Sequence, residues 1–114
     1  MLPPQAYEEA RRSAPHVVVI TVERVEPIDA MACAIHGRVL RVERGRKYKK
    51  GAEITIEAPA LGHAPAHPPA GGAIFQDSDA LRASRYGRAY LSETGELTLS
   101  QYQIMADRNA RPPR

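Results

Sequence analysis

Long apolar segments are missing from this sequence. A membrane-spanning helix needs about 18 to 20 consecutive apolar residues, and no window of the 114 residues approaches that length. A charged start followed by about 7 to 15 apolar residues, the mark of a signal peptide, is missing as well, although Met1 could equally stand where a leader has been removed. The sequence therefore predicts no membrane insertion and leaves the compartment open.

Cysteine and aromatic residues are scarce, with one Cys, one Phe, five Tyr and no Trp. A single cysteine excludes an internal disulfide and a cysteine-based zinc site. Cys33 lies between Ala32 and Ala34 in an expected strand, where it is most simply a small buried apolar residue. A nucleophilic cysteine would need a nearby imidazole or cation, and His36, three positions away, falls on the opposite face of a regular strand.

Catalytic and metal-binding motifs are also lacking. No glycine-rich phosphate loop follows a strand. His63 and His67 have the i, i+4 spacing of two metal ligands on one helix face, with His36 or Asp77 as a third ligand, but the prolines around them argue against a helix. Ser78 lies between two aspartates, and helix capping explains all three residues. We therefore expect no enzyme activity, no cofactor and no metal site.

Turn-forming residues, by contrast, are abundant, with 10 prolines and 8 glycines. That composition predicts many turns and short elements and favours β structure over helix. A length of 114 residues suits one domain with one core. The net charge of +3 and the pI near 9.3 permit an anionic partner without requiring one.

Hydrophobic patterning predicts most of the secondary structure. Good helix formers, with acids early and bases late, predict a short helix over residues 5–12. Strands are expected at residues 16–26, 31–44, 53–58, 87–92 and 96–105, a loop or flap at 59–72, and a short helix near 80–85 capped by Ser78 or Asp79. The last two strands should form a hairpin in which Gly95 adopts a positive φ.

Two strands carry more than simple alternation. Ile35, Gly37 and Val39 share one parity whereas Leu40 and Val42 take the other, which predicts a bulge or sharp bend beside the glycine. The first half of the earliest strand is apolar on both faces. Another element, such as the N-terminal helix, should therefore cover its back.

Five strands, a bend in a long early strand and a final hairpin predict an all-β fold, rich in strands with short helices. We expect a five- to six-stranded antiparallel sheet that closes or nearly closes into a barrel. The expected divisions are an N-terminal helical segment at residues 1–15, the barrel domain at 16–106 and a flexible tail at 107–114.

A family resemblance is carried by three segments, VVVITVERVE, HGRVLRVERGRKYKKGAEITIEAP and GRAYLSETGELTLSQYQIM. They resemble the netrin-like domains, which are the OB-type barrels of the tissue inhibitors of metalloproteinases and of the netrin C-terminal module. They look most like small uncharacterised bacterial proteins of that layout, which are usually exported, so the resemblance implies a periplasmic or secreted location. The inhibitors act through an N-terminal cysteine. This chain begins Met1-Leu2-Pro3, so that mechanism is not implied.

The densest group of charges lies between the second and third expected strands. Gly45 and Gly51 bound it, and the candidate contacts for an anionic partner are Arg44, Arg46, Lys47, Tyr48, Lys49 and Lys50. In the favoured interpretation the domain is a non-catalytic interaction module of the bacterial cell envelope. Its partner is then an unknown protein or a polyanionic surface, and its oligomeric state stays open.

The alternative interpretation is an OB-type module that binds single-stranded nucleic acid. The same cations, together with Arg38 and Arg41, would contact phosphates, and Tyr48 or Tyr102 would stack on a base. The low aromatic content weighs against it, because sheets that grip single strands usually present several aromatic residues. The acids flanking the hairpin, Glu43, Glu53 and Glu57, should also neutralise part of its field by cross-strand pairing.

Overall fold

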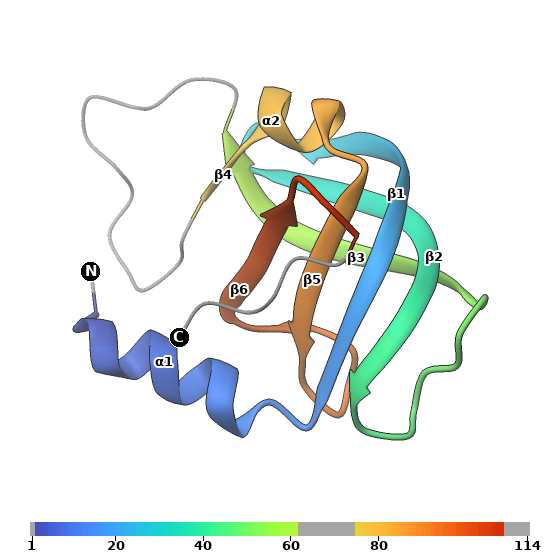
Figure 1. Ribbon diagram of the computed structural model, residues 1–114. Helices are drawn as coiled ribbons and strands as arrows, with labels where there is room; N and C mark the ends of the chain where they lie inside the picture. The colour runs from blue at the N-terminus through green and yellow to red at the C-terminus, as the bar shows by residue number, and fades with distance from the viewer. Residues whose placement is uncertain (1, 62–74, 109–114) are drawn as a thin grey trace.

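The computed structural model describes residues 2–61 and 75–108, which form a β-rich fold with two helices (Figure 1). In chain order the elements are α1 (Pro4–Ser13), β1 (His16–Asp29), β2 (Ala32–Arg44), β3 (Glu53–Leu61), β4 (Gln76–Asp77), α2 (Ser78–Ala83), β5 (Tyr86–Leu91) and β6 (Leu97–Met105). The strands make one sheet in the order β4-β3-β2-β1-β5-β6, and the sheet curls into a half-barrel (Figure 1). The all-β, barrel-like fold with an N-terminal helix and a short helix before the last hairpin is confirmed.

The sheet is antiparallel except at one edge, where β4 pairs in parallel with the last two residues of β3. β3 and β6 approach each other, but within the described residues no strand ladder joins them. Instead, the Gln76 side-chain amide donates a hydrogen bond of 3.0 Å to the backbone carbonyl of Tyr102. We call the gap between β3 and β6 the seam, since it is where the curled sheet stops short of closing.

Bulges bend the long pair β1–β2. Val22 pairs with Gly37 and Arg24 with His36, so Glu23 is an extra residue in β1. The interruption predicted beside Gly37 is confirmed, because the pairing of β2 with β1 also skips Leu40, the residue at which the parity of β2 changes. A bulge increases local twist, and in this pair it helps the sheet to curl.

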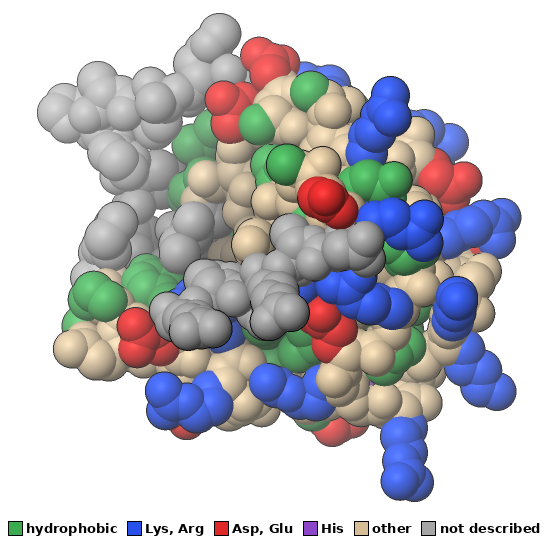
Figure 2. All heavy atoms as spheres, viewed as in Figure 1, with side chains coloured by type: hydrophobic (Ala, Val, Ile, Leu, Met, Phe, Trp, Pro, Cys, Tyr) green, Lys and Arg blue, Asp and Glu red, His purple; other side chains and the backbone are tan. Residues whose placement is uncertain are grey.

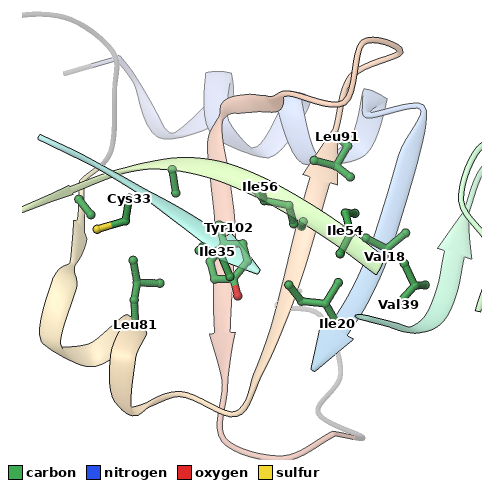
Figure 3. Packing of buried hydrophobic residues seen from close by; sticks show 13 residues of the cluster. Val18, Ile20, Cys33, Ile35, Val39, Ile54, Ile56, Leu81, Leu91 and Tyr102 are labelled. Atoms are coloured by element: carbon green, nitrogen blue, oxygen red, sulfur yellow. The ribbon is translucent and has the colours of Figure 1, made fainter. Parts of the chain in front are cut away.

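The concave side of the sheet holds the main core (Figure 3). The clean alternation of β3 places Ile54, Ile56 and Ala58 inside and the residues between them outside. Leu81 of α2 closes one end of this core and is fully buried. Cys33, with 3% of its surface exposed, is part of the same cluster, as the sequence predicted.

The back of β1 is covered at its start, also as predicted. Ala14, at the end of α1, packs with Val17 and Tyr90 in a second small cluster. Farther along the helix, the Arg11 guanidinium donates a hydrogen bond of 2.6 Å to the Gln101 side chain of β6. These contacts explain why residues of both parities are buried in the first half of β1.

The boundaries of β3 and α2 differ from the sequence prediction. β3 runs through Pro59 to Leu61, where a loop was expected, because Pro59 lies at a position where the missing N–H faces away from β2; the rest of that predicted loop, 62–72, lies outside the described residues. α2 begins at Ser78 and is capped by Asp77, whose carboxylate accepts from the amides of residues 79 and 80. Both expected caps, Ser78 and Asp79, are therefore wrong.

Two further features were not predicted. β4 is only two residues long, and its parallel pairing depends on a neighbour that sequence alone does not reveal. In β6, the non-glycine residues Leu99 and Ser100 have positive φ values of 44° and 60°, and pairing with β5 is interrupted there. Neither α1 nor α2, the helices of the described part, has the length and apolar character that a membrane span needs.

Candidate functional site

The basic stretch between β2 and β3 forms a structured hairpin tip, which we define as residues 45–51. Its ends, Gly45 and Gly51, have positive φ values of 89° and 87°. At Gly45 a Cβ atom would lie 2.1 Å from the Nδ1 atom of His16, so a side chain has no room there. The glycine at this end is thus required both by the turn and by the close approach to β1.

Tyr48 anchors the tip against the end of the barrel. Its ring meets that of His16 edge-on, with centroids 5.7 Å apart and an interplanar angle of 85°, and the side chain packs against the main core. Burial raises the pKa of the Tyr48 hydroxyl. At Gly95 in the β5–β6 turn, a Cβ would lie 2.9 Å from the Tyr48 hydroxyl oxygen, so both turns meet at this tyrosine.

Lys47 ties the tip to the same turn. Its ammonium group donates a hydrogen bond to the backbone carbonyl of Glu93 and lies 5.8 Å from the centroid of the Tyr48 ring. The Glu93 carboxylate in turn lies 3.1 Å from the Nε2 atom of His16, a residue with only 6% of its surface exposed. Lys47 therefore has a structural role in holding the two hairpin turns together.

Arg44, at the end of β2, is also used inside the protein. Its Nη1 atom lies 2.9, 2.9 and 2.8 Å from the carbonyl oxygens of Arg11, Arg12 and Ala14. These are carbonyls at the C-terminal end of α1, which lack partners within the helix. The guanidinium satisfies them and also complements the negative end of the helix dipole.

Replacing Arg44 by methionine, which keeps the aliphatic stem, should destabilise the domain by about 1–2 kcal/mol. The loss should appear first as faster hydrogen exchange of the α1 amides, because the helix end loses its cap. Arg46 lies two positions farther along the chain and is exposed. Arg46→Met is therefore the matched control and should change stability by less than about 0.5 kcal/mol. Equal exchange rates in α1 for both variants would show that Arg44 does not hold the helix.

Three cations of the tip remain uncommitted. Arg46, Lys49 and Lys50 are exposed, and within the described residues no hydrogen bond or ion pair holds their side chains. All three lysines of the chain fall within residues 47–50. Figure 2 shows Lys and Arg side chains projecting from the side of the molecule that carries the β2–β3 hairpin.

The acids expected to neutralise the tip are engaged elsewhere or unpaired. Glu43 pairs with Arg41 at 3.2 Å and with Arg88 at 2.6 Å. Glu53 pairs with Arg38 at 3.0 Å. Glu57 makes no ion pair with the described residues. The carboxylates of Glu43 and Glu53 therefore neutralise arginines of the strands and not the cations of the tip. The tip keeps its positive charge.

The other candidate contact residues from the sequence are paired or buried inside the protein. Arg38 and Arg41, the two strand arginines of the nucleic-acid interpretation, are paired with carboxylates. Tyr102 is 6% exposed, and burial raises the pKa of its hydroxyl, so it does not offer a face for stacking. His36 bonds Thr55 at 3.2 Å and Glu26 at 3.3 Å.

The sequence also offers candidate metal ligands, namely His63 and His67 with His36 or Asp77. In residues 2–61 and 75–108 no three His, Cys, Asp or Glu side chains converge as a metal site would require. His63 and His67 lie outside the described residues. The Cys33 thiol lies 3.9 Å from the hydroxyl of Ser78, and His36 is bonded to other partners on the exposed face.

Comparison of the chain with protein-family models, with curated proteins and with solved structures finds no match.

Sequence reasoning missed the buried ion pair of Arg88 and Glu43. Arg88 has no exposed surface, and its guanidinium donates to the Glu43 carboxylate at 2.6 and 3.1 Å and to Gln103 at 3.0 Å. Burial alone would raise the pKa of the Glu43 carboxyl, but the hydrogen bonds and charges of Arg88 and Arg41 outweigh it and hold that pKa below its usual value. The one available signal was an arginine inside the otherwise apolar strand 86–91.

Proposed function

We propose that this protein is a non-catalytic binding module that presents its hairpin tip to an anionic partner, either a protein or a polyanionic surface. The observation that carries the proposal is that some residues of the tip hold it in place while others stay exposed. Lys47 and Tyr48 fix it to the body of the domain, while Arg46, Lys49 and Lys50 are exposed and have no partner in the described part of the chain. Cations on a held turn lose less conformational freedom on binding than cations on a free loop.

The strength of such a site would depend on salt. Exposed charges act over a Debye length of about 8 Å at physiological ionic strength, so the three cations attract a partner only at close range. Each cation near an anionic surface contributes on the order of 1 kcal/mol. Together they are sufficient for a modest, salt-sensitive affinity.

We infer the family and the compartment as part of the same proposal. A netrin-like, OB-type barrel is supported by the succession β1-β2-β3, a helix, and a final hairpin that returns to the far side of β1. The periplasmic or secreted location follows from the sequence resemblance alone. An anionic component of the bacterial envelope is the partner that agrees with both the cationic tip and this location.

The proposal predicts a specific loss of polyanion binding. The triple variant Arg46→Ser, Lys49→Ser and Lys50→Ser should bind heparin roughly 10- to 100-fold more weakly at low salt, because it removes the uncommitted cations. Lys47 is left in place, since its replacement would disturb the contact with Glu93. Affinity would be measured by fluorescence titration and folding by circular dichroism, with stability unchanged to within about 0.5 kcal/mol.

A matched control removes three exposed cations elsewhere, Arg24, Arg82 and Arg85. This variant has the same net charge and should retain most of the heparin affinity. Equal losses in both triple variants would mean that binding follows net charge and not the tip. Tighter binding of labelled oligothymidylate than of heparin, with a steep loss as salt rises, would favour the nucleic-acid alternative.

A further inference from the structure

Among the residues that the structure describes, no strand pairs with the outer edge of β3 before Ala60. The pairing of β2 with β3 joins His36 to Thr55 and Gly37 to Ile54, and the amide of Val39 donates to the carbonyl of Ala52 at 2.9 Å. Because an antiparallel strand directs successive residues alternately toward and away from its neighbour, the even-numbered residues of β3 bond to β2. The odd-numbered residues direct their backbone groups outward.

Two of these outward residues, Thr55 and Glu57, offer free backbone groups. Within the described residues no hydrogen bond is made by their amides or carbonyls on the side away from β2. The next outward residue, Pro59, has no N–H to offer, and β4 begins to cover the edge at Ala60. The open edge thus extends from Glu53 to about residue 58, enough for a strand of roughly five to six residues.

A groove runs along this edge in the seam. Its volume is about 680 Å³, and its walls come from the start of β2, from β3, from Phe75 and from the β5–β6 turn with the start of β6. Met31, Phe75 and Leu97 supply apolar surface, and Met31 is 45% exposed. The size and mixed lining are those of a site that holds side chains of a ligand.

The charge of the groove has one sign. Glu57 and Glu96 line it, and none of the lining residues that the structure describes is Lys or Arg. Neither carboxylate is engaged in an ion pair with a described residue. The groove therefore favours a cationic occupant and disfavours nucleic acid, whose phosphates the two carboxylates would repel.

The opposite wall explains why the seam stays open. The bulge at Leu99 and Ser100 interrupts the regular path of β6, and Ser100 lines the groove. The carbonyl of Tyr102, which faces the seam, is already satisfied by the side chain of Gln76. β6 thus does not complete the ladder on β3, and β3 keeps its unpaired edge.

We propose that the seam binds an extended peptide segment of a partner protein, in which Lys or Arg alternates with apolar residues. The segment adds to the outer edge of β3 as a further strand. The outward backbone groups of Thr55 and Glu57 bond to it, its apolar side chains contact Met31, Phe75 and Leu97, and its cations meet Glu57 and Glu96. Main-chain bonds supply affinity and the groove supplies selectivity, as in other cases of strand addition. This site differs from the hairpin tip in place and in the sign of its charge.

The first test uses a fluorescein-labelled peptide of about seven residues that alternates Val and Lys. It should bind saturably, with a dissociation constant below about 1 mM at low salt. In hydrogen exchange, the amides of Thr55 and Glu57 should exchange rapidly in the free protein and become protected by the peptide, while those of Ile54 and Ile56 are protected in both states. No saturable binding at about 1 mM, or protection elsewhere, would overturn the proposal.

Variants then distinguish the contribution of the backbone hydrogen bonds to peptide binding from that of the groove carboxylates. Thr55→Pro removes the outward amide and should weaken binding about tenfold, with folding checked by circular dichroism. Should Thr55→Pro fail to fold, the double variant Glu57→Lys and Glu96→Lys tests the groove independently, with an expected loss of at least about tenfold.

A charge control completes the design. The double variant Glu8→Lys and Glu23→Lys, on α1 and β1, has the same net charge as the groove variant and should retain the peptide. A peptide that alternates Val and Glu should not bind the wild type. Equal binding of both peptides, or equal losses in both double variants, would refute a cationic strand in the seam.

Discussion

Replacing Gly37 by alanine is expected to destabilise the domain by about 3 kcal/mol or more. A Cβ atom at this position would lie 1.9 Å from the carbonyl oxygen of Thr21 on the neighbouring strand. The obstacle is backbone in the most extensively paired part of the sheet, so no side chain can rotate away to relieve it. Urea unfolding followed by circular dichroism would measure the loss.

Gly51→Ala is the matched comparison. Gly51 has a positive φ of 87°, but no heavy atom lies within 4 Å of the position that its Cβ would take. Alanine there costs only the strain of a left-handed conformation, about 1–2 kcal/mol. A Gly37→Ala variant that loses no more stability than Gly51→Ala would show that β1 and β2 do not approach as closely as described.

Glu43→Ala should be the most damaging change at a charged residue, with a loss of about 3 kcal/mol. It removes the carboxylate that receives two hydrogen bonds from Arg88, whose side chain has no exposed surface. A buried guanidinium without its counter-charge is costly because it has been taken out of water. Glu57→Ala, which removes an exposed carboxylate that has no ion pair with a described residue, is the control and should stay within about 0.5 kcal/mol of the wild type.

The same pair makes a prediction about acid. The pKa of Glu43 is lower in the folded protein than its ordinary value, so the pair contributes stability above the unfolded pKa. That contribution is lost as the pH falls through the folded pKa. The stability difference between wild type and Glu43→Ala should therefore shrink as the pH is lowered below about 4, and urea titrations at several pH values would detect it.

A double replacement separates pairing from packing. Glu43→Leu with Arg88→Met exchanges the ion pair for apolar side chains and should recover most of the stability lost in Glu43→Ala, because an apolar pair has no desolvation cost. If the double variant were as unstable as Glu43→Ala, the loss would lie in the shape of the site and not in an unpaired charge.

Local patterning accounts for the features that sequence predicted well. Alternation in 53–58 and the β-branched run in 16–22 specify strands and their buried faces without knowledge of their neighbours. The parity change beside Gly37 indicated a bulge, since a regular strand would have exposed one of its two apolar sets. Gly45, Gly51 and Gly95 marked turns because each is at a place where the chain needs a positive φ.

The features that were missed depend on contacts between distant residues. Arg88 and Glu43 are 45 positions apart, and His16 and Glu93 are 77 apart. Which strands become neighbours, and which bulge turns a given side chain toward another, cannot be read from local periodicity. The cap of α2 was misplaced by one or two residues for a related reason, because three consecutive residues could each have accepted the helix amides.

By itself, the sequence determined a curled, strand-rich domain with a cationic turn, because hydrophobic period, glycine placement and charge density are local properties of the chain. Only the tertiary structure decided how that turn is used. It assigned Arg44 to the end of α1 and Lys47 and Tyr48 to the body of the domain, and it left Arg46, Lys49 and Lys50 exposed, with no partner among residues 2–61 and 75–108. It also left the edge of β3 unpaired beside an acidic groove, since the closure of a sheet depends on the path of strands far apart in sequence.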